Sequence, residues 1–538
     1  MTTSTAGRPA PRRTGRAGRV VAAQAAVALP VAAAPYGPGA VAAAGIAAVA
    51  VCALAWLRVR QRWVSEWAAV GLAYLTRRRT LRCAPDGLCA CAAPGSRLLP
   101  AELAGDDAAV LADGYGLTAV VEVGDPTGIL VAGDQPLPGP AELAALAGAD
   151  GPPLRGQVVL SSRPAPAARL GQAPAAASYR QLTDGQVAAD ARTLLTLCAP
   201  AGGWSAEELR RALSSAVRKL RQRYPALAAR PLGAEALRRT LHDLAHHEPR
   251  RTGAESWAAV RSGALLQAGY LLDLPPDAAS TGRLLARLRA LPAVATTVAL
   301  TQAPTATVRL AAPDGEALAG CARRLQEAAA AHRVRVVALD GRHRRALAAT
   351  LPLGATAPAP VAAASAPAHP GPAGAALRTP RAGLMVGVNR DGVPVLVRLF
   401  RPEPTRALLV GGVAAAQLLA VRALAAGARV VVRTTRPGAW EPFARAAGAP
   451  GAEVAVTLPA TPEPGGDDPL HPLLSVLDAG PVPYDLPADA AWRTQLVVRD
   501  ELVAVDSATL ALSDLVVLQP LRAAEADLVG AVLGLGAA

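Results

Sequence analysis

The sequence predicts a membrane-anchored α/β protein. It would have an N-terminal two-helix transmembrane hairpin, a mixed α/β cytoplasmic domain, and a second, Rossmann-like doubly wound α/β domain. Three observations lead to this prediction. Residues 20–57 contain no charged side chain. Residues 352–382 are mostly Pro, Ala and Gly, a composition that forms linkers rather than cores. Strand-like and helix-like runs then alternate through residues 383–538, as parallel βαβ units require.

The hairpin, residues 20–57, is predicted from two apolar runs, Val20–Ala34 and Ala40–Leu57, separated by a Pro- and Gly-rich turn at residues 35–39. A helix needs about 20 apolar residues to cross a membrane, and the second run is close to that length. The first run is shorter and contains a proline, so a re-entrant first helix is the alternative. Arginines in the basic arm, residues 1–19, and just after the second run place both ends in the cytoplasm. A cleaved signal peptide would not explain the second run.

An inner-surface segment rich in Trp and Arg, residues 58–82, is predicted to follow. Aromatic side chains at and after the end of the second run return to one face of a helix. Tryptophan and tyrosine favour the headgroup level of a membrane, and arginines attract anionic lipids. We therefore expect these residues at the membrane interface: Trp56, Trp63, Trp67, Tyr74, Arg77, Arg78 and Arg79. An aromatic stripe packed in a soluble core is the alternative interpretation.

The chain has 55 basic and 41 acidic residues and a net charge of +14, with much of the excess in the N-terminal arm and beside the hairpin. This distribution favours contact with membrane lipids over nucleic-acid binding, which needs basic and aromatic residues interleaved. Six cysteines in a cytoplasmic chain argue against a disulfide framework. Cys83, Cys89 and Cys91 are weak candidates for metal ligands. They lack a second pair and a neighbouring histidine, so we expect reduced thiols and no metal.

Residues 100–350 predict the mixed α/β domain. Asp113-Gly114 lies between two strand-like runs, which indicates a β-hairpin. Ser205 and the glutamate three residues later match a capping box at the start of an amphipathic helix. Gly128–Ala132 is expected to form a further strand.

The domain at residues 383–538 begins with a strand at Arg406–Val410, the turn Gly411-Gly412, and a helix at Ala414–Ala426. This is where a nucleotide-binding loop would lie. A P-loop needs G-x-x-x-x-G-K-[ST], with lysine on the phosphates and a hydroxyl on magnesium, and this sequence has neither. We therefore predict a domain without a functional P-loop and no cofactor, and Gly411 and Gly412 are only weak cofactor-binding candidates.

No catalytic residue is predicted, and we do not expect an enzyme. The stretch His242-Asp243-Leu244-Ala245-His246 resembles the H-E-x-x-H zinc-protease motif. Aspartate replaces the glutamate that acts as base, and no third ligand is evident. We interpret this stretch as a solvated helix end.

The overall layout resembles EccE, a membrane component of type VII (ESX) secretion systems, in the actinobacterial branch with an extended C-terminus. The layout is a basic arm, a hairpin with almost no outer loop, a Trp-rich inner segment and a cytoplasmic domain. More specific stretches are also similar to that branch: Ala177–Leu182, Ser205–Leu220, Glu255–Trp257, Leu265–Ala268, Arg401–Arg406, and Trp492 with Leu496–Leu502.

The resemblance implies a non-catalytic structural subunit of the secretion complex in the cell membrane, with both termini and most of the chain cytoplasmic. It also implies EccB-, EccC- and EccD-type partners, of which the EccC type would supply the ATPase. The alternative is a membrane-tethered enzyme or ligand-binding regulator that uses the Gly411-Gly412 turn.

Overall fold

The computed structural model describes residues 14–56, 58–59, 62–81, 88–125, 128–131, 133–248, 251–354, 377–448, 453–462, 468–481 and 490–535. The chain separates into two compact units, residues 1–79 and residues 80–538. The second unit contains two lobes, named here the antiparallel lobe (residues 80–354) and the parallel lobe (residues 383–535), after the direction of their strands.

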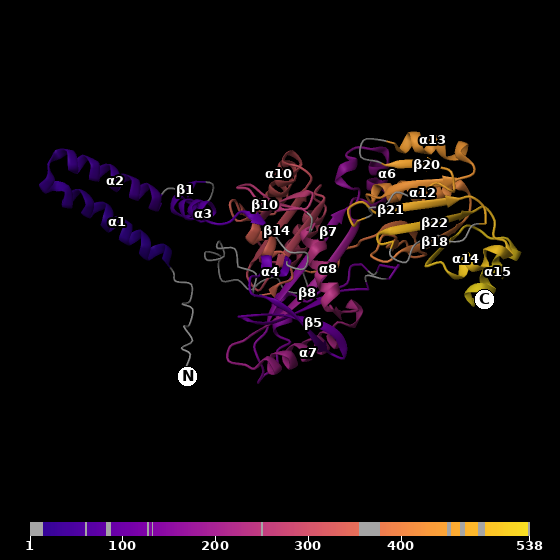
Figure 1. The fold of residues 1–538 in the computed structure, drawn as a ribbon, viewed down its shortest axis with the longest axis horizontal. Helices are drawn as coiled ribbons and strands as arrows, with labels where there is room; N and C mark the ends of the chain where they lie inside the picture. Colours follow the sequence, from indigo (N-terminus) through magenta and orange to yellow (C-terminus); the bar gives the residue numbers. More distant parts are fainter. Residues whose placement is uncertain are drawn as a thin grey trace. The chain divides into compact units, whose positions relative to one another are not determined.

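The first unit contains a pair of long helices side by side (Figure 1). Its elements are α1 (Thr14–Ala33), η1 (Ala34–Tyr36), α2 (Pro38–Trp56), β1 (Arg58–Val59), β2 (Arg62–Trp63) and α3 (Val64–Thr76). The predicted helical hairpin and its turn are therefore confirmed as secondary structure. Among the described residues, none of the helices combines the length and the apolar character that crossing a membrane requires.

Large apolar side chains point outward from both helices of this hairpin. Val27 and Val31 on α1 are 71% and 70% exposed, and Ile46 and Val49 on α2 are 74% and 68% exposed. A helix that is apolar on all sides normally lies in a core or a membrane. In this unit, α2 has such a surface and most of it is uncovered.

The antiparallel lobe is built on one large sheet. Its strands are β3 (Thr80–Leu81), β4 (Arg97–Leu103), β5 (Asp106–Asp113), β6 (Gly116–Glu122), β7 (Arg155–Pro164), β8 (Ala188–Pro200), β9 (Arg230–Pro231), β10 (Gly253–Glu255), β11 (Val260–Ser262), β12 (Leu265–Asp273), β13 (Ala295–Leu300), β14 (Thr305–Ala312) and β15 (Val336–Ala338). The order across the sheet is β3-β10-β11-β12-β14-β13-β7-β8-β6-β5-β4, with β15 also on β12 and β9 on β6.

Helices pack against this sheet and complete the core. They are α4 (Leu88–Ala92), α5 (Pro140–Ala144), η2 (Ala168–Leu170), α6 (Pro174–Thr183), α7 (Ala206–Arg223), η3 (Pro225–Leu227), α8 (Ala234–Ala245), α9 (Ala278–Arg289), α10 (Gly315–Ala331) and α11 (His343–Ala349). The predicted capping box is confirmed, because Glu208 N donates to Ser205 Oγ and Ser205 N donates to the Glu208 carboxylate. Leu213, Val217 and Leu220 on the inner face of α7 are fully buried.

Of two strand predictions for this part of the chain, one is confirmed and one needs correction. The hairpin at Asp113-Gly114 is confirmed, since β5 and β6 pair antiparallel around it. The strand expected at Gly128–Ala132 is wrong: Leu130 makes only an isolated bridge, to Val397 of the parallel lobe, and Ala132 lies outside the described residues. The segment bonds to another lobe rather than joining the sheet, and local sequence does not encode that choice.

The parallel lobe confirms the predicted doubly wound fold. Its elements are β16 (Leu384–Val388), β17 (Pro394–Val397), β18 (Thr405–Val410), α12 (Val413–Ala425), β19 (Arg429–Thr434), α13 (Pro437–Ala447), β20 (Val454–Thr457), β21 (Leu473–Asp478), β22 (Arg493–Arg499), η7 (Ala504–Asp506), α14 (Ser507–Ala511), β23 (Leu515–Leu518) and α15 (Ala523–Leu533). All pairings in the six-stranded sheet, in the order β20-β19-β21-β22-β18-β23, are parallel.

Helices cover both faces of this sheet. On one face, α12 and α13 pack on alternate strand residues such as Leu409 and Val432, with Trp440 of α13 fully buried. On the other face, α14 and α15 pack on Leu408 and Val497. Successive side chains of a strand point to opposite faces, so strands apolar throughout suit a sheet covered on both sides.

The predicted linker ends earlier than residue 382. Residues 355–376 lie outside the described residues. Leu377 is fully buried in the core of the antiparallel lobe. The backbone N–H of Thr379 donates to Gln135 O at 2.9 Å, and Ala188 N donates to Arg381 O at 2.9 Å. Residues 377–382 are therefore part of the folded unit, because backbone hydrogen bonds compensate for their weakly apolar composition.

Candidate functional site

Two regions of the second unit could carry chemistry: the edge of the parallel sheet where its strands end, and the junction between the lobes. In doubly wound sheets, ligands bind outside the carboxyl ends of the strands. The predicted candidates Gly411 and Gly412 lie at that edge, between β18 and α12. The residues around them decide whether the edge can accept a ligand.

The space at the Gly411-Gly412 turn is filled by a side chain from the end of β23. Gly412 N donates to Gln519 Oε1 at 3.2 Å. A Cβ atom placed on Gly411 would lie 2.4 Å from the same oxygen. The side-chain amide of Gln519 thus uses a backbone N–H that a phosphate would need. The weak candidate cradle is occupied by the chain itself.

The carboxylate at this edge is also fully engaged. Asp478, the last residue of β21, accepts hydrogen bonds from Arg436 at 2.7 Å, Trp440 Nε1 at 2.7 Å and Thr434 Oγ1 at 3.0 Å. Burial alone would raise the pKa of Asp478, but the hydrogen bonds from Arg436, Trp440 and Thr434 outweigh it and the pKa is lowered. Arg436 also binds Asp500 at 2.6 Å.

These contacts leave little for a nucleotide or a metal to bind. The Asp478 carboxylate has five hydrogen bonds from three side chains, and the arginine nearest to it is shared between two acids. A carboxylate whose oxygens are used in this way stabilises the fold and is not available to coordinate a metal or a ligand. The edge of the parallel sheet is therefore closed by its own side chains.

The second region is a charge network where the lobes meet. Arg163 on β7 binds Asp190 on β8 at 3.0 Å. Two residues along β8, Arg192 binds Glu122 at 2.9 Å and Asp243 at 3.2 Å, and donates to Thr240 Oγ1 at 2.8 Å. Glu122 is only 4% exposed, so its charge depends on this arginine.

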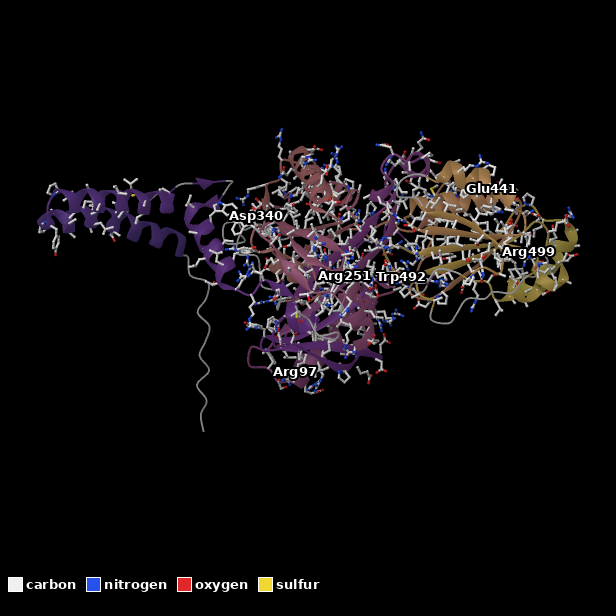
Figure 2. The ribbon with its side chains drawn as sticks, turned by 45° about the horizontal axis from the view of Figure 1, so that its top comes forward. Arg97, Arg251, Asp340, Glu441, Trp492 and Arg499 are labelled. Carbon is white, nitrogen blue, oxygen red and sulfur yellow. The ribbon has the colours of Figure 1, made fainter. Side chains whose placement is uncertain are left out.

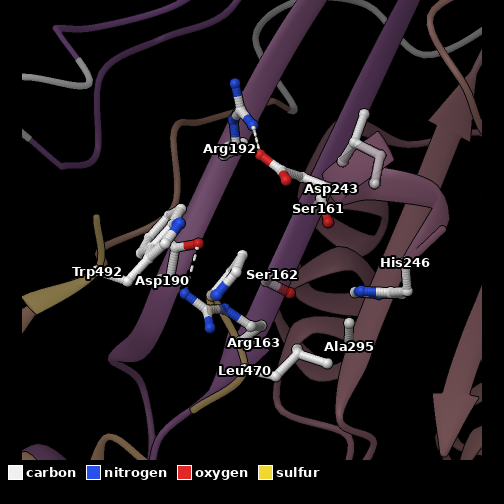
Figure 3. A pocket seen from close by; sticks show the side chains of 12 residues that line it. Ser161, Ser162, Arg163, Asp190, Arg192, Asp243, His246, Ala295, Leu470 and Trp492 are labelled. Atoms are coloured by element: carbon white, nitrogen blue, oxygen red, sulfur yellow. Dashed lines mark hydrogen bonds and ion pairs between the residues drawn. The ribbon is translucent and has the colours of Figure 1, made fainter. Parts of the chain in front are cut away.

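Trp492 lies where the two lobes meet (Figure 2), with its side chain beside Arg163 and Asp190 of this network (Figure 3). The Arg163 guanidinium lies 5.7 Å from the centre of the Trp492 ring, within the range of a cation–π contact. The backbone N–H of Trp492 donates to Arg401 O at 2.8 Å, and its carbonyl accepts from Leu473 N at 3.0 Å. The backbone of Trp492 is thus held by the parallel lobe, and its indole ring contacts Arg163 of the antiparallel lobe.

A cavity of about 40 Å³ lies on each side of Trp492. The first, shown in Figure 3, is lined by Ser162, Arg163, Asp190 and His246 among others. Ser162 is 2% exposed, and within the described part of the chain its Oγ has no hydrogen-bond partner. Substrate pockets measure roughly 300–1,000 Å³, whereas a single water needs about 10–15 Å³. Each cavity has room for a few waters but not for a substrate.

The interpretation of His242–His246 as a solvated helix end is confirmed for the helix end, but the side chains of Asp243 and His246 are not simply solvated. α8 ends at Ala245, and His246 follows in the left-handed conformation with φ 49°, so the two histidines do not share a helix face. Asp243 binds Arg192, and His246 points into the cavity. Burial, followed by the charges of Arg309 and Arg163, lowers the pKa of His246 to about 3. The imidazole is therefore neutral.

The cysteine candidates do not form a cluster in the described part of the chain. Cys83 lies outside the described residues. Cys89 is buried on α4 with its Sγ 3.3 Å from Ser96 Oγ, and burial raises the pKa of its thiol. Cys91 is half-buried on the same helix. No group of three or more His, Cys, Asp or Glu side chains suited to a metal occurs among the described residues.

The residues predicted at the membrane interface lie at the end of the first unit. Trp56 is 46% exposed at the end of α2, and Trp67 and Tyr74 lie seven residues apart on α3. The guanidinium groups of Arg77 and Arg79 lie 5.7 and 5.2 Å from the centre of the Tyr74 ring. Arg78 is exposed, and Trp63 belongs to β2, although its side chain lies outside the described residues.

Sequence reasoning missed the residues that join the lobes. Arg163, Asp190 and Arg192 lie in strands, and the only signal available was charge within otherwise apolar runs. Trp492 had been noted only as part of a family-like stretch. No protein-family model matches the chain, and no curated protein matches it either.

Proposed function

We propose that this chain is a non-catalytic structural subunit of a type VII secretion complex in the cell membrane, with its folded lobes on the cytoplasmic side. The observation that carries the proposal is the closed edge of the parallel sheet. Gln519 fills the turn at Gly412, and Arg436, Trp440 and Thr434 saturate Asp478. A lobe with a nucleotide-binding topology but a filled edge suits a scaffold better than an enzyme.

The resemblance to EccE gains support from where its stretches lie. Ala177–Leu182 belongs to α6, whose Tyr179 hydroxyl accepts from Met385 N at 3.1 Å. Arg401–Arg406 leads into β18, and Arg401 O accepts from the backbone of Trp492. Both of these stretches lie where the two lobes contact each other. The stretch Ser205–Leu220 instead lies on α7, which packs on β4, β6 and β8 of the antiparallel lobe.

The uncovered apolar surface of the hairpin supports membrane attachment. In a bilayer, the exposed apolar side chains of the hairpin would be removed from water: Val27, Val31, Ile46 and Val49. Each Å² of apolar surface removed from water gains about 25 cal/mol of free energy. The aromatic and arginine side chains after α2 would then lie at the headgroup level.

The anchor can be tested by placing charges on the exposed face of α2. We expect Ile46→Asp together with Val49→Asp to release the chain from membranes during alkaline carbonate extraction, because each charge at mid-helix costs about 2.5–3.5 kcal/mol. Leu458→Asp, which changes a residue of the parallel lobe that is 68% exposed, is the matched control and should stay in the pellet. A double variant that stays with the membrane as firmly as the control would refute the hairpin anchor.

The function is tested by a pull-down of the tagged chain from native membranes in mild detergent, followed by mass spectrometry. We expect EccB-, EccC- and EccD-type subunits in constant ratio to the chain. A known membrane complex purified in the same detergent shows that assemblies survive. If the chain is recovered alone under those conditions, the scaffold proposal fails.

A further inference from the structure

A groove of about 320 Å³ lies between α6 of the antiparallel lobe and α12 of the parallel lobe. It is separate from both the closed sheet edge and the Trp492 cavities. Leu182 and Leu418, 39% and 50% exposed, line it together with Val421. Its polar lining residues are Ser178, Tyr179, Gln181 and Arg422. Its volume falls at the lower end of the range for small-molecule sites.

Arg422 has donors that the described part of the chain does not use. Its Nη1 donates to the carbonyl oxygens of Met385 and Val386 at 2.9 and 2.8 Å. Its Nε is buried and has no hydrogen-bond partner among the residues that the structure describes. Burial lowers the pKa of Arg422, and among the described residues the interaction that raises it comes from Tyr179 rather than from a carboxylate. A half-buried guanidinium that has no acidic partner in the described part of the chain is a favourable place for an anion.

We propose that this groove binds a free amphipathic carboxylate, with its anionic group on Arg422 and its apolar chain against Leu182, Leu418 and Val421. Arginine and carboxylate form short, charge-assisted hydrogen bonds, and the planar guanidinium matches the two oxygens. The apolar walls would remove the hydrocarbon chain from water. This ligand is independent of the proposed role in secretion, and the groove is separate from the closed edge of the parallel sheet.

The length of the groove favours a small molecule over a docked helix from a partner. The lining residues span one turn of each helix, residues 178–182 of α6 and 418–422 of α12. One turn is about 5.4 Å long. A helix that docks in a groove uses anchors at i, i+3, i+4 and i+7, which extend over two turns. A short acid with a chain of several carbons suits the available length.

The test is calorimetric titration of octanoate into the full chain in lipid nanodiscs, with empty nanodiscs as the background for partitioning. We expect saturable binding with a Kd below about 1 mM. Octanamide, which has the same chain but no charge, should show no saturable binding. If the chain proves soluble without lipid, the same titration runs in buffer, so loss of the anchor proposal leaves this one testable.

Two variants distinguish the contribution of Arg422 to binding from a general loss of stability in the lobe. Arg422→Gln should weaken octanoate binding at least about tenfold, because it removes a charge-assisted pair. Leu418→Glu keeps Arg422 and supplies a competing carboxylate inside the groove, so it should also abolish binding. Leu458→Glu introduces the same charge outside the groove and should bind octanoate normally. Equal binding of octanamide, or unchanged affinity in the folded Leu418→Glu variant, would overturn the proposal.

Discussion

Replacing Asp478 with alanine is expected to destabilise the parallel lobe by about 3–5 kcal/mol, because three donor side chains would lose the charged carboxylate that accepts their hydrogen bonds. Trp440 and Thr434 are both fully buried, and each donates its side-chain hydrogen to this carboxylate. Without it, the indole N–H and the hydroxyl lose their partner, and Arg436 keeps only Asp500. Thermal unfolding followed by circular dichroism measures the loss.

This variant also discriminates between a scaffold and an enzyme. An acid that held a metal for catalysis would be dispensable for stability, and its loss would leave the melting temperature near that of the parent. Glu441→Ala, an exposed change on α13 of the same lobe, is the matched control and should lie within about 0.5 kcal/mol of the parent. If Asp478→Ala melts like this control, the carboxylate is not the structural hub inferred from its contacts.

The pH dependence of the parallel lobe follows from the same contacts. The pKa of Asp478 in the folded protein is lower than the ordinary aspartate value of 3.8, because the hydrogen bonds to its carboxylate outweigh the opposing effect of burial. Its contribution to stability is therefore fully present above the unfolded pKa and is lost as the pH falls through the folded pKa. The contribution of Asp478 should be constant from pH 5 to 8 and decline only below about pH 4.

The parallel lobe was predictable because its signals are local. Strands buried on both faces read as continuous apolar runs, and short loops join them to amphipathic helices. The closed edge was not predictable, because Gly412 and Gln519 meet across 107 positions of the chain. The missing lysine and hydroxyl argued against a P-loop, but nothing in the local pattern showed which side chain fills the turn.

The antiparallel lobe is harder to predict because some of its charged residues are paired inside the fold. Apart from threonines, Asp190 and Arg192 are the polar residues of β8, and charged residues usually mark a surface. Here each has a partner on a neighbouring element, so both can lie inside the fold. For the same reason, Asp243 was assigned to a solvated helix end. Only the three-dimensional structure shows its pairing with Arg192.

The second large effect is expected at Arg192. Its replacement by methionine preserves much of the apolar stem but removes the charge between Glu122 and Asp243. Because Glu122 is 4% exposed, its carboxylate would stay buried without its ion-pair partner, a loss of about 3–5 kcal/mol. Arg210→Met, which breaks an exposed pair with Glu207 on α7, should cost no more than about 0.5 kcal/mol.

The effect of Arg192→Met should depend on pH with a defined sign. Burial raises the pKa of Asp243, and Arg192 is the charge that lowers it most, so the variant should raise it further. An acid with a raised folded pKa binds protons more readily in the folded state, so stability increases as the pH falls through that pKa. The difference in unfolding free energy between parent and variant should therefore shrink from pH 7 to pH 5. Denaturant unfolding at each pH measures it, and a gap that stays constant or widens on acidification would show that Arg192 does not stabilise the lobe junction through its acidic partners.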